Sequence, residues 1–140
     1  MKPLIARPRL TVVAWLSLWG VMVLLMHVPL PHSGVPRVPY LDKVAHFGLY
    51  FALSFLGAVR LVAFGSRITI DRLILWGGLY GVYGAIDELT QPWTHRTADL
   101  NDWLADAVGI ASATWIAFVI LRNAKLSAPK VAALRDTRGD

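Results

Sequence analysis

The stretch DLNDWLADAVGIASATWIAFVIL, residues 99–121, joins a long apolar run to three regularly spaced aspartates. The apolar part is about as long as the 20 or so residues that a helix needs to cross a hydrocarbon core. Asp99, Asp102 and Asp106 repeat at i, i+3 and i+7, so a helix presents them on one face. The stretch therefore predicts a membrane-spanning helix with an acidic face at one end.

The composition of the whole chain agrees with a membrane protein. Of the 140 residues, 56% are hydrophobic and 16% are charged, whereas a soluble domain has about 25% charged residues. The net charge is +5, and most of the basic residues lie at the N-terminus, in one short loop and in the C-terminal tail, which favours membrane orientation and contact with anionic headgroups over nucleic-acid binding. Because there is no cysteine, disulfides, thiolate metal sites and thiol nucleophiles are excluded.

Four apolar runs follow one another along the chain. They extend from Leu10 to about Pro31, Lys43 to about Phe64, about Leu73 to Leu89, and about Asn101 to Leu121. We expect residues 1–122 to form an all-α, integral membrane four-helix bundle, followed by a basic cytoplasmic tail over 123–140. The first run follows a basic start, as a cleaved signal peptide does. It is long for a signal peptide and no small-residue cleavage site follows it, so we expect an uncleaved span.

Turn-forming residues separate these runs. Two outer loops are predicted, one after the first run and one over residues 91–99, and the first contains Pro29, Pro31, Pro36 and Pro39. Asp42 stands where the N-cap of the second helix is expected. Glycine and alanine form small-residue stripes on the third and fourth runs, which predict close helix packing, with a homodimer contact as the alternative use. The stripes are Gly77, Gly81, Gly84 and Ala85, and Ala105, Gly109 and Ala113.

The basic residues are divided unequally between the two sides of this arrangement. Lysine and arginine are retained on the cytoplasmic side of short loops, whereas aspartate and glutamate have little influence on topology. The predicted outer side carries Arg37, Lys43 and Arg96. The other side carries Lys2, Arg7, Arg9, Arg60, Arg67, Arg72, Arg122, Lys125, Lys130, Arg135 and Arg138. Both termini are therefore predicted to be cytoplasmic.

Polar residues gather near the outer ends of the second, third and fourth runs. Lys43, His46 and Tyr50 share one helical face, Asp87 and Glu88 end the third run, and Gln91 lies one turn further. Together with Arg96, Asp99, Asp102 and Asp106, they are expected to line one shared cavity. Ionisable side chains at membrane depth are costly and mark functional sites by default.

Charge balance leaves two kinds of chemistry open. Six carboxylates face two permanent cations, Lys43 and Arg96, and close carboxylates in a low-dielectric pocket bind a proton or a cation. A divalent ion is one reading, and its candidate ligands are His46, Glu88, Asp99 and Asp102. The other reading is general acid or base catalysis beside an anion held by Lys43 and Arg96, with Glu88, His46 and Asp102 as catalytic candidates.

The same residues also suit simpler roles. Asp42 and Asp99 also suit helix caps, and Lys43 also suits a side chain that extends to the headgroups. Arg96 also suits a fork-shaped pair with a carboxylate. The whole set also suits a buried charge network that fixes the fold of a non-catalytic scaffold or partner protein. Ion transport is disfavoured because the charged residues collect at one end of the predicted helices.

Three motifs in order resemble the VanZ-like family. They are Asp42-Lys43-x-x-His46-Phe47-x-x-Tyr50, Asp87-Glu88-x-x-Gln91, and Arg96-x-x-Asp99-x-x-Asp102-x-x-x-Asp106-x-x-Gly109, and they cover about residues 40 to 110. The family usually has asparagine before the glycine where this chain has Asp106. The added charge makes a purely amide-type role doubtful there and favours a bound cation or proton.

The resemblance implies a small multi-pass protein of the bacterial cytoplasmic membrane, in a family named for glycopeptide, particularly teicoplanin, resistance. It carries no mechanism with it. We expect an outward-facing polar pocket that binds a lipid-linked or anionic envelope ligand, with membrane lipids as surroundings. In this hypothesis Lys43, His46 and Arg96 contact the anion, and Tyr50, Gln91, Asp99 and Asp106 complete the ligand site. Whether a reaction follows stays open; phosphoryl or acyl transfer is the first class to test.

Overall fold

The computed structural model describes residues 7–27, 40–94 and 97–122. Three parts of the sequence-based prediction lie outside these residues: the proline-containing loop, Arg96 and the basic tail over 123–140. The described residues are all helical apart from short connections, as the apolar runs predicted.

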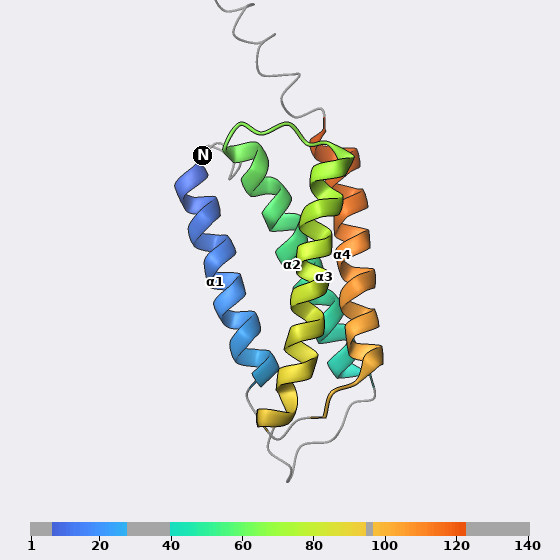
Figure 1. Cartoon of the computed structure of the whole chain (residues 1–140). Coiled ribbons are helices and arrows are strands. Elements are labelled where there is room, and N and C mark those ends of the chain that lie inside the picture. Colours follow the sequence, from blue (N-terminus) through green and yellow to red (C-terminus); the bar gives the residue numbers. More distant parts are fainter. Residues whose placement is uncertain (1–6, 28–39, 95–96, 123–140) are drawn as a thin grey trace, which may run out of the picture.

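Four long helices lie lengthwise beside one another (Figure 1). α1 and α3 run in one direction and α2 and α4 in the other, so successive helices are antiparallel (Figure 1). A short 3₁₀ helix, η2, follows α3 where the sequence predicted an irregular loop. The bounds are α1 Pro8–His27, α2 Leu41–Ala63, α3 Ile70–Thr90, η2 Gln91–Thr94 and α4 Leu100–Leu121.

The starts of α2 and α4 differ in how they are capped. Asp99 caps α4 as its position suggested, since its Oδ1 accepts a hydrogen bond from the backbone N–H of Asn101 at 2.9 Å. The prediction that Asp42 caps α2 is wrong. Tyr40 occupies the N-cap position with a φ of 63°, and Asp42 lies inside the first turn. An acidic residue in that turn still interacts favourably with the helix dipole.

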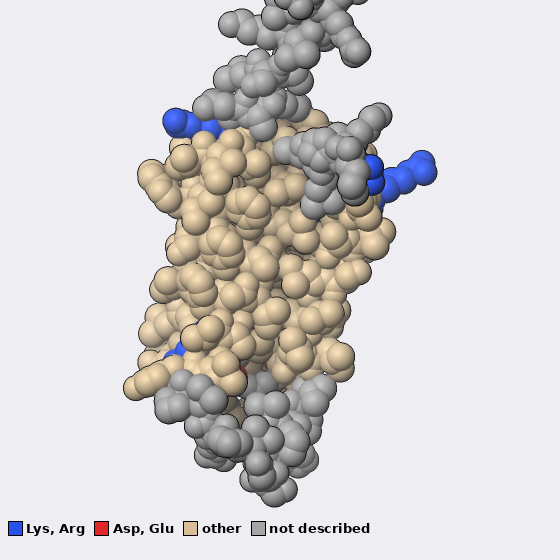
Figure 2. Space-filling view, turned by 180° about the vertical axis from the view of Figure 1, so that it is seen from behind, with Lys and Arg blue, Asp and Glu red and all other residues tan. Residues whose placement is uncertain are grey.

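Three of the four helices are long and apolar enough to cross a membrane: α1, α2 and α4. α3 is long enough but less apolar, because its span includes several glycines and the acidic residues Asp87 and Glu88. Large apolar side chains on α1, α3 and α4 face outward. Leu24 is 61% exposed, Leu75 62% and Trp115 65%. The surface seen in Figure 2 is uncharged across its middle. Such a surface is typical of a protein embedded in an apolar medium.

α2 and α4 form the closest helix pair. Their backbones meet where Gly109 of α4 faces α2, because a Cβ at that position would lie 2.5 Å from the carbonyl oxygen of Phe47 and 3.2 Å from the backbone nitrogen of Phe51. Ala113, one turn further along α4, is fully buried. The predicted small-residue stripe on the fourth run therefore packs against the second run.

α1 packs on the remaining helices largely through aromatic rings. Trp19 meets Tyr83 edge to face, with ring centroids 4.3 Å apart, and the indole N–H of Trp15 donates to the Tyr80 hydroxyl at 3.1 Å. On α3 the glycine stripe is only partly used for packing. Gly84 faces α4, whereas the space beside the Cα of Gly81 is open.

Candidate functional site

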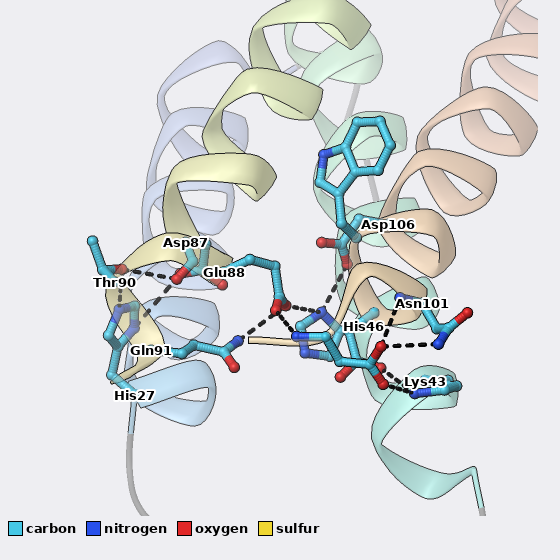
Figure 3. Close-up of polar contacts among 12 residues, drawn as sticks. His27, Lys43, His46, Asp87, Glu88, Thr90, Gln91, Asn101 and Asp106 are labelled. Carbon is cyan, nitrogen blue, oxygen red and sulfur yellow. Dashed lines mark hydrogen bonds and ion pairs between the residues drawn. The ribbon is translucent and has the colours of Figure 1, made fainter. Parts of the chain in front are cut away.

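A polar cluster lies at the end of the helices formed by the C-termini of α1 and α3 and the N-termini of α2 and α4 (Figures 1 and 3). Its members come from elements far apart in the sequence, and α2, α3 and α4 all contribute. The buried ionisable residues of the cluster are His46, Asp87, Glu88, Asp102 and Asp106, each at most 6% exposed.

At the centre of the cluster, His46 of α2 meets Asp106 of α4 (Figure 3). The His46 Nδ1 lies 2.9 Å from Asp106 Oδ1 and 3.7 Å from Glu88 Oε1, and both His46 and Asp106 are fully buried. When the Asp106 carboxylate is ionised it can only accept, and His46 Nδ1 is then the donor of this bond.

Lys43 closes the cluster toward its exposed side. Its Nζ donates to Asp99 Oδ2 and to Asp102 Oδ1, each at 2.8 Å. About a third of the lysine side chain remains exposed. Two of its three N–H donors are therefore used by carboxylates of α4 and its cap.

Glu88 connects the end of α3 to the start of α4. Its Oε2 accepts from the backbone N–H of Asp99 at 2.9 Å, and its Oε1 accepts from the Gln91 side-chain amide at 3.1 Å. Gln91 is itself buried. These two bonds hold the Glu88 carboxylate in a fixed position beside His46.

His27 belongs to no motif of the sequence. It ends α1 and joins the edge of the cluster, with its Nδ1 3.6 Å from Asp87 Oδ1 and its Nε2 3.1 Å from the Thr90 hydroxyl (Figure 3). Its position at the end of a predicted span was the one signal available, and it has no motif spacing to the other polar residues because it comes from a different helix.

Three buried polar atoms in the cluster have no hydrogen-bond partner within the part of the chain that the structure describes. They are His46 Nε2, the Tyr50 hydroxyl and Asp106 Oδ2. The Tyr50 hydroxyl and Asp106 Oδ2 both lie beside Gly84, 3.3 and 3.1 Å from the position that a Cβ there would take. Buried polar groups are nearly always satisfied, so unsatisfied ones need an explanation.

Two groups of side chains in the described residues have the spacing of metal ligands. One is His46, Glu88 and Asp106, all buried, and the other is Asp42, His46 and Asp102, in which Asp42 is exposed. Of the ligands suggested from the sequence, His46 and Glu88 belong to the first group and Asp102 to the second. Asp99 belongs to neither group, and its oxygens accept from Lys43 and from the backbone N–H of Asn101.

The structure therefore brings together the sequence-predicted residues Lys43, His46, Tyr50, Glu88, Gln91, Asp99, Asp102 and Asp106. Arg96 lies outside the described residues. The comparisons with known proteins found no matching family model, no matching curated protein and no matching solved structure. The resemblance to the VanZ-like family thus rests on the three polar motifs.

Asp99 provides a test of the Lys43 contact through pH. The Lys43 ammonium beside it holds the pKa of the Asp99 carboxyl below its usual range, and the Asn101 N–H adds to this effect. A group with a lowered folded-state pKa contributes stability above its unfolded pKa of about 3.9 and loses it as the pH falls through the folded value. The melting temperature of wild type should therefore exceed that of Asp99→Asn above about pH 4, and the gap should narrow in stronger acid.

Asparagine also caps helices, so this variant changes mainly the charge. The narrowing should be smaller when both proteins also carry Lys43→Gln, because the ammonium is the main cause of the lowered pKa. A gap of constant size from neutral pH to pH 2 would contradict the Lys43–Asp99 contact.

Proposed function

We propose that this protein is a multi-pass integral membrane protein of VanZ-like type in the bacterial cytoplasmic membrane. We further propose that its polar cluster binds an anionic, lipid-linked ligand of the cell envelope at the extracytoplasmic face. One observation carries the proposal: ionisable side chains from three helices are buried together at a single end of an otherwise apolar set of helices. Such groups are expensive at membrane depth and mark functional sites.

The orientation follows from the arginines. Six described arginines lie at the opposite end of the helices: Arg7, Arg9, Arg60, Arg67, Arg72 and Arg122. Most of the blue surface in Figure 2 lies at that end. The retention of basic residues on the cytoplasmic side supports cytoplasmic termini and an extracytoplasmic polar cluster, with α3 crossing the membrane among the more apolar helices. A four-helix integral membrane bundle is the arrangement that we propose.

Lys43 is the described residue best placed to contact an anion. Its side chain is about a third exposed, Asp99 and Asp102 fix the position of its ammonium, and the third N–H would serve an incoming oxygen. A phosphate or carboxylate on a lipid would approach Lys43 from the headgroup region. The apolar outer surface of the helices suits the hydrocarbon part of such a ligand.

A non-catalytic scaffold is the second candidate, and one observation favours it. The bond from Asp99 N–H to Glu88 ties the end of α3 to the start of α4, which is a structural effect in itself. The two candidates differ in what Glu88→Gln does. A scaffold loses abundance and melting temperature with this substitution, whereas a ligand site loses binding while the protein stays in the membrane.

Native mass spectrometry of the detergent-purified protein tests the ligand. A polyprenyl phosphate is the probe, and phosphatidylcholine is the lipid without net charge. We expect wild type to retain the polyprenyl phosphate, and Lys43→Gln to bind it about tenfold more weakly or worse, because a hydrogen bond to a charged group is lost. Lys43→Arg should retain most of the binding.

Arg72→Gln is the matched control, since Arg72 is an exposed basic residue at the opposite end. It should bind the probe as wild type does. Equal retention of both lipids by wild type, or equal retention of the probe by Lys43→Gln, would count against the proposed function. Melting curves of each variant separate loss of binding from loss of the fold.

A further inference from the structure

We infer that His46, Glu88 and Asp106 form a binding site for one divalent transition-metal ion such as Zn²⁺ or Mn²⁺. Each residue comes from a different helix, and one potential ligand atom of each lies within 4.8 Å of the other two. All three side chains are buried. The inference goes beyond the proposed function, because it stands on the geometry of these residues and requires no lipid ligand.

The distances suit such an ion. Imidazole nitrogen and carboxylate oxygen bind zinc at about 2.1 Å, so two ligands of one ion lie about 3.0 to 3.4 Å apart in tetrahedral or octahedral geometry. His46 Nδ1 lies 2.9 Å from Asp106 Oδ1 and 3.7 Å from Glu88 Oε1, which brackets this range. Small side-chain adjustments therefore suffice to place an ion among the three atoms.

The donor set also suits a borderline divalent ion. Imidazole favours zinc and related transition metals, whereas carboxylates are accepted by zinc and manganese alike. Among the described residues, neither the carboxylates of Glu88 and Asp106 nor the neutral His46 ring is paired with a lysine or arginine. Lys43, the nearby cation within the described residues, is bound to Asp99 and Asp102 instead. An ion bound at His46 Nδ1 requires the ring proton to move from Nδ1 to Nε2, because a neutral imidazole that binds a metal through one nitrogen carries its proton on the other.

Unsatisfied polar atoms beside the three ligands give an independent sign of a missing partner. Among the described residues, the fully buried Tyr50 hydroxyl has no hydrogen-bond partner, and it lies beside Gly84 with the equally unpartnered Asp106 Oδ2. His46 Nε2 is also buried and unpaired. The hydroxyl supplies a donor for a carboxylate that binds metal through its other oxygen, which is the usual outer support of a metal ligand.

Glu88 is already held in place for this role. The Gln91 amide and the Asp99 backbone N–H each donate to one of its oxygens, and each oxygen keeps a second lone pair. The alternative ligand group of Asp42, His46 and Asp102 is less suitable. Asp102 Oδ1 is 2.8 Å from the Lys43 ammonium, so a metal ion there would lie close to a positive charge.

The inference is tested on the full chain in detergent, purified through a streptavidin-binding tag because a polyhistidine tag binds zinc itself. The protein is stripped with EDTA and then titrated with Zn²⁺ or Mn²⁺. We expect close to one ion per chain by elemental mass spectrometry. Asp106→Asn and Glu88→Gln should each weaken binding at least about a hundredfold, since loss of a ligand exceeds the effect of an outer-shell change.

Asp71→Asn is the matched control, because Asp71 is an exposed aspartate at the opposite end of α3, and it should bind as wild type does. Pulsed electron paramagnetic resonance of bound Mn²⁺ gives a readout on folded protein with His46 intact. An imidazole nitrogen coupling should persist when the other three histidines, His27, His32 and His95, are replaced by asparagine.

The site is overturned if neither Zn²⁺ nor Mn²⁺ binds at close to one ion per chain. It is also overturned if Asp106→Asn and Glu88→Gln both bind the ion as wild type does. If Asp106→Asn and Glu88→Gln do not fold, the test is the nitrogen coupling in the variant that keeps only His46. Its presence there supports the site, and its absence overturns the site. If the protein binds the ion but does not retain polyprenyl phosphate, the proposed lipid ligand is rejected and the metal site stands. Lipid retention without ion binding does the reverse.

Discussion

Gly109→Ala should separate α2 from α4 and destabilise the protein by about 2 kcal/mol or more. The new methyl carbon would lie 2.5 Å from the Phe47 carbonyl oxygen, and a backbone atom cannot rotate away as a side chain can. Relief therefore requires movement of a whole helix. The measurement is thermal or denaturant unfolding of the purified protein in one detergent, with helix content followed by circular dichroism.

Gly78→Ala is the matched control on α3, because nothing lies within 4 Å of the position that its Cβ would take. There the substitution brings only the higher helix propensity of alanine, worth up to about 1 kcal/mol. The two substitutions therefore change the free energy of unfolding in opposite directions and by different amounts. If Gly109→Ala is as stable as Gly78→Ala, the close approach of α2 and α4 is wrong.

His46→Ala should destabilise the protein by about 3–5 kcal/mol, because it leaves the Asp106 carboxylate buried without the ring that faces it. Asp106→Ala should cost less, since a histidine left alone can stay neutral. The double variant should lose less unfolding free energy than the sum of the losses in the two single variants. Unfolding free energies of all four proteins give the coupling, which we expect to be between about 0.5 and 3 kcal/mol.

The cycle is read most simply in EDTA, where a metal ion does not contribute. Glu88 also faces His46, so a second cycle with Glu88→Gln shows how the coupling is divided between the two carboxylates. Strict additivity of His46→Ala and Asp106→Ala would show that the two side chains do not interact in the folded protein, and the central contact of the cluster would fall with it.

The helices were predictable because each depends on a long apolar run. α4 was expected over 101–121 and extends over Leu100–Leu121, and the aspartate that caps it was visible as a capping residue. α1 and α3 begin two or three residues before their apolar runs. For α1, Pro8 suits the first turn of a helix. For α3, the helix also includes the charged residues Asp71 and Arg72, which precede the apolar run.

The convergence of the polar motifs also followed from the sequence, since helical spacing put Lys43, His46 and Tyr50 on one face. What could not be predicted was how the charges divide among partners. From the sequence, Lys43 suited contact with an anion or extension to the headgroups, and the structure shows that Asp99 and Asp102 flank it. The role of Tyr40 at the start of α2 depends on a left-handed backbone angle that no residue pattern signalled.

The meeting of main chains at Gly109 has a consequence for ion size. Gly109 lies three residues after Asp106 on α4, and Phe47 follows His46 on α2, so the backbones are pinned together one turn from the central contact. The spacing of α2 and α4 therefore limits how far the imidazole and the carboxylate can move apart, and side-chain adjustments change their separation only within that limit. Larger ions with long coordination bonds, such as calcium, would have to push α2 and α4 apart, so the fold favours ions of small radius.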